Sequence, residues 1–113
     1  MLPSANRLKR QKDIEKVFKK GIGFKEDFLI LKTVKSGLKN SRFAFVVSKK
    51  ISTKATTRNK IRRRLSELVR SLLKKVKSPA KDAILMAGQG LEKQDFWEME
   101  KSLVELFKKA KFL

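Results

Sequence analysis

The stretch from Ser48 to Leu68 combines the side chains that best bind phosphate groups. It reads SKKISTKATTRNKIRRRLSEL and follows directly on an apolar run. Lysine ammonium groups attract phosphate as point charges, arginine forks bind two of its oxygens at once, and hydroxyl groups add further donors. Backbone N–H groups at the start of a helix bind anions as well. The segment therefore predicts an anion-binding surface, with a solvated basic face as the simpler interpretation.

The placement of these charges favours the anion-binding interpretation. Five cations fall in the first turns of a predicted helix: Arg58, Lys60, Arg62, Arg63 and Arg64. Each opposes the helix dipole at a cost of about 0.3–1 kcal/mol, and like charges three or four residues apart repel each other. A sequence selected for stability alone would place acids here. We therefore expect an external anion to offset the charge.

Composition excludes most familiar catalytic chemistry. The chain has no histidine and no cysteine, so it lacks an imidazole base, a cysteine nucleophile and the usual zinc ligands. The aspartates and glutamates fall at helix-like spacings, where caps and surface pairs account for them. We therefore predict no catalytic residue and no metal site on this chain, with carboxylate chemistry left as the open alternative.

Charge and length indicate one domain that binds a polyanion. Thirty lysines and arginines against 11 acids give the 113 residues a net charge of +19. Such a charge attracts nucleic acid through release of condensed counterions. A membrane surface is the competing polyanion, but the sequence has no apolar run of about 18 residues and no signal peptide. We expect a single domain over residues 1–113, soluble and cytoplasmic, without a membrane partner.

Hydrophobic periodicity predicts the first elements of the fold. A helix is expected over residues 11–20, followed by Gly21 as a C-cap of positive φ. Its apolar stripe consists of Ile14, Val17 and Phe18. The period then changes to two in residues 27–35 and 42–50, which we expect to pair as an antiparallel hairpin.

The anion-binding segment opens a second helix, expected over residues 58–76 with a threonine as its N-cap. Its buried face consists of Ile61, Leu65, Leu68, Val69, Leu72 and Val76. A strand at residues 83–87 follows, and then a helix in which Asp95 and Glu98 form a capping box. The order of helix, strands, helix, strand and helix predicts an α+β two-layer sandwich.

Residues 43–68, FAFVVSKKISTKATTRNKIRRRLSEL, resemble the signature of the bacterial ribonuclease P protein subunit. In that family a strand ending in Ser-Lys-Lys leads to a helix that begins Arg-Asn-Arg. The opening NRLKRQKDIEKVFKKG, residues 6–21, is similar to the family's amino terminus. Helix order and length match too, so the resemblance covers nearly the whole chain.

The resemblance implies an RNA-binding subunit of a ribonucleoprotein endonuclease, a hydrolase that removes the 5′ leader from precursor tRNA. In this family the RNA subunit and its Mg²⁺ ions perform the hydrolysis, so the implied partners are ribonuclease P RNA and precursor tRNA. No cofactor on the protein itself is implied. The implied order is αβββαβα, with a four-stranded mixed sheet and a left-handed βαβ crossover, where right-handed is the ordinary expectation.

Carried over by position, the basic helix and the lysines before it bind the RNA subunit. The implied contacts are Lys49, Lys50, Lys54, Arg58, Asn59, Lys60, Arg62 and Arg63. Two positions depart from the family pattern. Lys60 stands where arginine is usual, which removes a planar two-pronged contact. Ser52 stands where glycine is usual, which disfavours a turn of positive φ.

The second implied surface is a cleft between the first helix and the sheet, where leader nucleotides lie. Its positions here are Ile14, Phe18 and Leu31, of which only Phe18 is aromatic. Because stacking a base on an aromatic ring is worth about 1–3 kcal/mol, leader binding here should depend less on stacking. Ordinary core packing is the alternative interpretation for all three residues.

The remaining aromatic residues are assigned to the core. Phe43 and Phe45 share one strand face, but the chain lacks the βαββαβ order of an RNA-recognition motif. Phe96 is expected to begin the buried stripe of the last helix, and Trp97 to be a packing anchor in its first turn. The competing function classes are a ribosomal or other structural RNA-binding protein and a DNA-binding architectural protein. The combined amino-terminal and Ser-Lys-Lys patterns favour the ribonuclease P resemblance over both of these classes.

Overall fold

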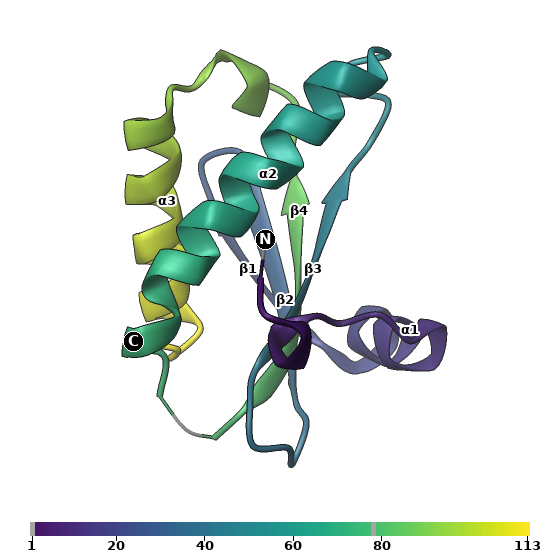
Figure 1. The fold of residues 1–113 in the computed structure, drawn as a ribbon, viewed down its shortest axis with the longest axis vertical. Coiled ribbons are helices and arrows are strands. Elements are labelled where there is room, and N and C mark those ends of the chain that lie inside the picture. Colours follow the sequence, from purple (N-terminus) through teal and green to yellow (C-terminus); the bar gives the residue numbers. More distant parts are fainter. Residues whose placement is uncertain (1, 78) are drawn as a thin grey trace.

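The computed structural model describes residues 2–77 and 79–113. Within them the α-helices are α1 (Gln11–Lys20), α2 (Ala55–Leu72) and α3 (Phe96–Lys109). The strands are β1 (Ile22–Glu26), β2 (Leu29–Lys35), β3 (Arg42–Val47) and β4 (Lys81–Ala87). Short 3-10 turns are η1 (Ser4–Asn6), η2 (Leu73–Lys75) and η3 (Leu91–Lys93). The predicted α+β architecture with a four-stranded mixed sheet is confirmed (Figure 1).

The strands lie in the order β1-β2-β4-β3. β1 and β2 form an antiparallel hairpin, β2 pairs antiparallel with β4, and β3 pairs parallel with β4. The predicted hairpin between residues 27–35 and 42–50 is therefore wrong, because β4 lies between them. Ile84 and Leu85 point to opposite faces of β4 and both are fully buried. A strand that is apolar on both faces gains most from a central position.

The β3–α2–β4 connection is left-handed, as the resemblance implied. In Figure 1 both strands run upward, α2 crosses in front of the sheet, and β4 lies to the left of β3. A right-handed connection would place β4 on the other side of β3. This topology carries the start of α2 to the upper end of β3, so the lysines after β3 and the first turns of α2 are brought together.

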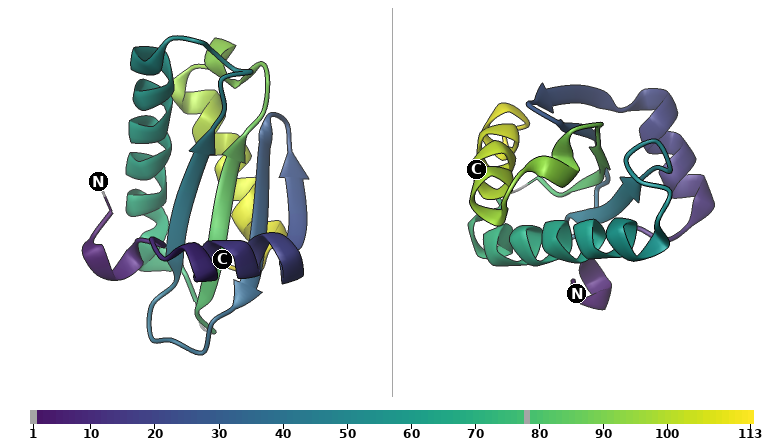
Figure 2. Two further views of the ribbon diagram at one scale, coloured as in Figure 1. Left: turned by 90° about the vertical axis from the view of Figure 1, so that its right-hand side faces the viewer. Right: turned by 90° about the horizontal axis from the view of Figure 1, so that it is seen from above.

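Helices cover the two faces of the sheet unequally. α2 and α3 pack on one face and enclose the main core, whereas α1 alone crosses the other face (Figure 2). The α1 side holds a small cluster of Leu8, Val17 and Ile84, with partly buried neighbours around it. None of the helices in the described part of the chain has the length and apolar composition needed to span a bilayer.

The ends of the helices test the predicted caps. The bounds of α1 and the capping box of α3 are confirmed: Asp95 Oδ1 accepts from the Glu98 N–H at 2.8 Å, and Glu98 Oε1 accepts from the Asp95 N–H at 3.1 Å. The positive φ predicted for Gly21 is wrong, since its φ is −71°. Glycine is needed there for space, because a Cβ would lie 2.3 Å from the carbonyl oxygen of Val17.

The second helix begins three residues earlier than predicted, at Ala55, and its last turn is the 3-10 turn that ends at Lys75. The prediction that Thr56 or Thr57 is the N-cap is wrong, because Lys54 occupies that position and both of these threonines lie inside the helix. The predicted buried face is confirmed from Ile61 to Leu72. That face fixes the helix on the sheet and turns the basic residues outward.

Candidate nucleic-acid interface

The start of α2 is an exposed cluster of positive charge. Within the described residues, the N-cap Lys54 makes no side-chain cap hydrogen bond, and no acid lies in the first turn. The first N–H groups of the helix are thus left without a side-chain acceptor. Lys49, Lys50 and Lys54 are all exposed on the loop before it. The backbone dipole and the side chains therefore present charge of the same sign to solvent.

Hydrogen bonds hold two arginines of this cluster in place. Arg58 Nη1 donates to the Ser52 carbonyl oxygen at 2.9 Å, and Arg62 Nη1 donates to Asn59 Oδ1 at 2.6 Å. A guanidinium carries five N–H donors, so each arginine keeps others for an anion. Because the forks are ordered before any anion binds, less side-chain entropy is lost on binding.

The loop before α2 is fixed at its centre. Ile51 is buried in the main core, and Gln89 Nε2 donates to the Lys50 carbonyl oxygen at 3.3 Å. The Ser52 hydroxyl accepts from the Lys54 N–H at 3.2 Å. Ser52 is not among the described residues with positive φ. The loop therefore forms with serine where the family pattern has glycine.

The remaining predicted RNA-subunit contacts lie along the outer side of the helix. Asn59, Lys60 and Arg63 are exposed, and Lys60 and Arg63 line a shallow hollow of about 180 Å³ with Glu67. We call the eight predicted positions together the α2 basic face. It consists of Lys49, Lys50, Lys54, Arg58, Asn59, Lys60, Arg62 and Arg63. The arrangement suits a run of closely spaced phosphates.

Phe18 and Ile14 lie on α1, on the other face of the sheet. Phe18 is 41% exposed, and Lys32 Nζ lies 5.8 Å from the centroid of its ring while donating to the Phe18 carbonyl oxygen at 3.2 Å. An aromatic ring beside a cation is suited to stack on a base and to hold its phosphate. Ile14 is half-buried and packs against the small cluster under α1.

The prediction that Leu31 lines the same surface is wrong. Leu31 is fully buried in the main core, on the sheet face opposite α1. Its neighbour Ile30 points to the α1 side, in register with Met86 of β4, which is itself in register with Val46 of β3. α1 leaves this end of the sheet uncovered in the left-hand view of Figure 2.

We call Phe18, Ile30, Val46 and Met86 the open strip. Val46 is 39% exposed, and Ile30 and Met86 are partly exposed. Period-two alternation groups Ile30 apart from Leu31, but it cannot say which of the two groups faces α1. Knowing the strand order would have assigned the strip, because the register then places these three strand residues in one row.

The other aromatic residues divide between core and surface. Phe43 is confirmed as core, since its ring stacks on Phe107 at 5.7 Å and contacts Phe112. Phe45 packs partly buried against the same core. The anchoring role predicted for Trp97 and the burial predicted for Phe96 are both wrong, because the two residues are 73% and 41% exposed. They lie in the first turn of α3, before its buried stripe begins at Met99.

An ion-pair network fixes α1 on the sheet. Arg42 Nε and Nη2 donate to the two carboxylate oxygens of Asp82 at 2.8 and 2.6 Å, and Nη2 also lies 3.3 Å from Asp13 Oδ2. The hydrogen bond to Asp82 holds the pKa of Arg42 above its ordinary value against the opposing effect of burial. Asp13 is on α1, so the network sets the position of the helix that carries Phe18.

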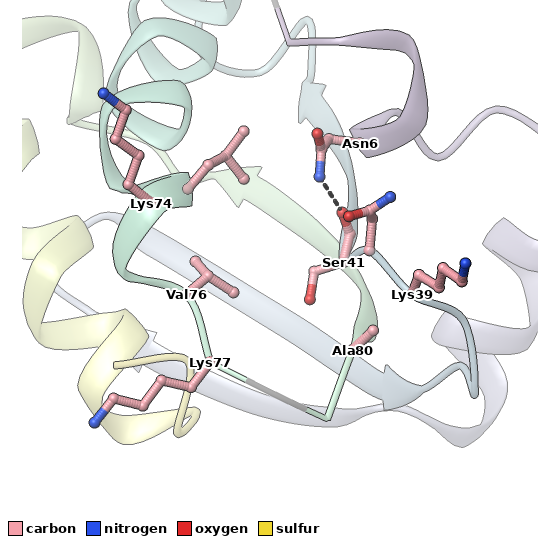
Figure 3. A pocket seen from close by; sticks show the side chains of 9 residues that line it. Asn6, Lys39, Ser41, Lys74, Val76, Lys77 and Ala80 are labelled. Carbon is pink, nitrogen blue, oxygen red and sulfur yellow. Dashed lines mark hydrogen bonds between the residues drawn. The ribbon is translucent and has the colours of Figure 1, made fainter.

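A further basic pocket of about 270 Å³ lies near the carboxyl end of α2. Asn6 Nδ2 donates to the Ser41 carbonyl oxygen at its wall, and Lys39, Lys74 and Lys77 stand around it. In Figure 3 the three ammonium groups point away from one another and out of the pocket. They do not converge on one ligand. In the described parts of the chain, no group of three or more acids is placed to hold a metal ion.

Comparison with known proteins agrees with this geometry. The model of the family described as Ribonuclease P matches residues 2–111. The chain is similar to the "Ribonuclease P protein component" of Syntrophomonas wolfei, with 37% identity over 97% of this chain and 91% of that protein. Its relative of the same name from Pseudanabaena is 35% identical over 100% of this chain and 97% of that protein.

Solved structures give the same result. A Staphylococcus aureus RNase P protein, a mutant described as defective in mRNA degradation activity, superposes with a TM-score of 0.88 at 28% identity, over 96% of this chain and 91% of that one. The RNase P protein from Thermotoga maritima superposes with a TM-score of 0.81 at 30% identity, over 91% of this chain and 96% of that one. The chain therefore belongs to the family of ribonuclease P protein components, which act in tRNA 5′ processing as part of a ribonucleoprotein.

Proposed function

We propose that the chain binds ribonuclease P RNA through the α2 basic face and holds the 5′ leader of precursor tRNA on the open strip. The observation that carries the first part is the start of α2, where cations surround helix N–H groups that no side chain caps. An RNA fold with phosphates closely packed on that face would offset the charge of the cations and the positive end of the helix dipole.

The open strip supports the second part of the proposal. A leader is single-stranded, and an exposed ring with apolar neighbours and a lysine beside it offers what such a strand needs, a stacking surface and a phosphate contact. Phe18 supplies the ring and Lys32 the cation. With one ring on the strip, Ile30, Val46 and Met86 bind the leader by apolar contact rather than by stacking.

Catalysis in this proposal is left to the RNA subunit. The chain contains neither histidine nor cysteine, and its role is to bind and orient the substrate and to lower the repulsion between RNA phosphates. Mg²⁺ ions held by the RNA supply the hydrolytic chemistry. Because protein cations replace part of the counterion atmosphere, the complex should need less Mg²⁺ than the RNA alone.

Reconstitution at low Mg²⁺ tests the proposal. The cognate ribonuclease P RNA is assayed for 5′ cleavage of precursor tRNA with and without the protein. We expect cleavage at a Mg²⁺ concentration at which the RNA alone is inactive, and a preference for precursor over mature tRNA in binding. If RNA alone is active at high Mg²⁺ and the protein gives no gain at low Mg²⁺, the proposal fails in favour of a structural RNA-binding role.

A further inference from the structure

A separate apolar pocket of about 510 Å³ lies at the end of the sheet away from the open strip. It opens between the carboxyl ends of α1 and α3, beside Lys35 and Lys81, which pair at the last position of the β2–β4 ladder. The three strand residues of the open strip lie near the other end of that ladder, where Leu29 pairs with Ala87. The pocket has the size of known small-molecule sites, about 300–1,000 Å³.

The inner wall of this pocket is apolar. Its apolar lining consists of Ile22, Phe24, Val34 and Ala110. Ile22 is 66% exposed, so the wall reaches the surface of the protein rather than closing over the core. An exposed isoleucine beside a pocket of this size offers a flat apolar group room to bind.

Lysines surround the opening. Five line it: Lys20, Lys35, Lys81, Lys109 and Lys111. Lys109 forms an ion pair with Glu26. In the parts of the chain that the structure describes, the other four have no carboxylate within ion-pair distance. Burial, together with the charges of Lys35 and Lys111, lowers the pKa of Lys81.

Local geometry keeps these charges at the pocket. Lys81 Nζ donates to the Ala110 carbonyl oxygen at 2.5 Å and lies 4.9 Å from the centroid of the Phe112 ring. Lys111 has a φ of 61°, a conformation in which glycine is the usual residue after a helix. Phe112 returns into the main core behind it. Backbone preference therefore does not explain why residue 111 is a lysine.

We propose that this lysine-ringed pocket binds one nucleotide of a single-stranded RNA, with the base against the apolar wall and the adjoining phosphates on the lysines. Several cations around one opening match successive phosphates better than the single carboxylate of a fatty acid. The chain already belongs to a family that works in a ribonucleoprotein. The site is distinct from the α2 basic face and from the open strip, and it does not depend on either being correct.

Methyl and amide NMR of the labelled full chain tests the pocket with simple probes. Adenosine 5′-monophosphate should shift the methyl signals of Ile22, Val34 and Ala110, whereas inorganic phosphate should leave them in place. Shifts from both probes only at surface lysine amides would overturn the proposal. So would methyl shifts caused by dodecanoate but not by the nucleotide, since the site would then bind anionic amphiphiles.

Charge-matched variants test binding of the polymer. Lys35→Ala with Lys111→Gly removes two charges from the rim and places glycine at the positive φ. Lys93→Ala with Lys101→Ala removes two exposed charges elsewhere. For an octauridylate, the first pair should flatten the slope of log affinity against log salt by about 1.4, since each single-strand phosphate contact contributes about 0.7. Equal slopes for the two double variants would overturn the proposal.

One more variant separates this site from the proposed function. Phe18→Ala alters the open strip and leaves the pocket intact, so the nucleotide-induced methyl shifts at Ile22 and Ala110 should persist in it. If they vanish, the nucleotide was bound at the strip and the pocket proposal fails. If precursor tRNA binding is unaffected by Phe18→Ala while the pocket shifts remain, the strip proposal fails alone.

Discussion

Arg42 of β3 reaches Asp13 of α1 at 3.3 Å while both carboxylate oxygens of Asp82 hold the same guanidinium. One side chain thus joins the only α-helix on its face of the described sheet to two adjacent strands. Asp82 is almost fully buried, whereas Asp13 is partly exposed. The two acids should therefore contribute differently to stability.

We expect Asp82→Asn to lower the free energy of unfolding by about 1.5–3 kcal/mol, the usual range for a hydrogen bond to a charged group. Asp13→Asn should cost less than about 1 kcal/mol, as is usual for an exposed ion pair. Urea denaturation measures both. Hydrogen exchange should show faster opening of α1 in Asp13→Asn with β4 unchanged. Equal costs for the two variants would mean that Arg42 does not distinguish them.

Replacing Arg58 and Arg62 together with alanine should weaken binding of ribonuclease P RNA and flatten its salt dependence. Two lost phosphate contacts should reduce the slope of log affinity against log salt by about 2. Filter binding over a range of salt concentrations measures the slope, and circular dichroism checks the fold. Lys93→Ala with Lys101→Ala is the matched control. A slope that stays at the wild-type value would contradict direct phosphate contact.

Phe18→Ala should weaken binding of precursor tRNA to the reconstituted holoenzyme by about 5- to 150-fold, the equivalent of about 1–3 kcal/mol for one stacked base. Mature tRNA, which has no leader, should bind as before. Trp97→Ala removes an even more exposed aromatic group, on α3, and should leave both affinities unchanged. A parallel loss for precursor and mature tRNA would place Phe18 outside the leader contact.

Gly21→Ala should destabilise the fold by about 1–3 kcal/mol, as overpacking does. Its φ of −71° suits any residue, so the cost comes from the Cβ placed 2.3 Å from the Val17 carbonyl oxygen. Gly23→Ala is the matched control, because its Cβ would meet only the Lys32 side chain, at 4.0 Å. Thermal or urea unfolding of both variants measures these costs, and equal costs would show that the contact with the Val17 carbonyl oxygen is not their cause.

Stability should rise with pH through Lys81. Burial and the neighbouring lysines lower its pKa in the folded state below the ordinary value of 10.5. The unfolded chain then binds more protons than the folded chain between the two pKa values, so raising the pH across that window favours folding. Urea midpoints at pH 7 to 10 should rise more for the wild type than for Lys81→Met. If the urea midpoints of the two proteins changed equally with pH, titration of Lys81 would not contribute to the pH dependence of stability.

Local patterns in the sequence predicted what local physics decides. The bounds of α1, the Asp95–Glu98 capping box and the buried face of α2 all follow from residues within a few positions of each other. Strand pairing did not follow, since β3 pairs with β4 across an intervening helix. The left-handed crossover came only from the family resemblance.

For the candidate site too, the part within one segment of the sequence was predicted and the part that depends on strand order was not. The α2 basic face could be located because unfavourable charge at a helix start is visible in a single segment. The open strip combines residues from α1, β2, β3 and β4, so its membership depends on sheet order and on which face α1 covers. Leu31 was misassigned for this reason, because its neighbour Ile30 is the residue of β2 that faces the α1 side.

The main core lies wholly on the side of the sheet covered by α2 and α3. Ile30, Val46 and Met86 therefore stand on the reverse side of strands whose stability is secured elsewhere. Substitution at these positions changes what the protein touches more than whether it folds. Under the proposed function, exchange of the strip as a unit between relatives should change leader preference while the scaffold stays as it is.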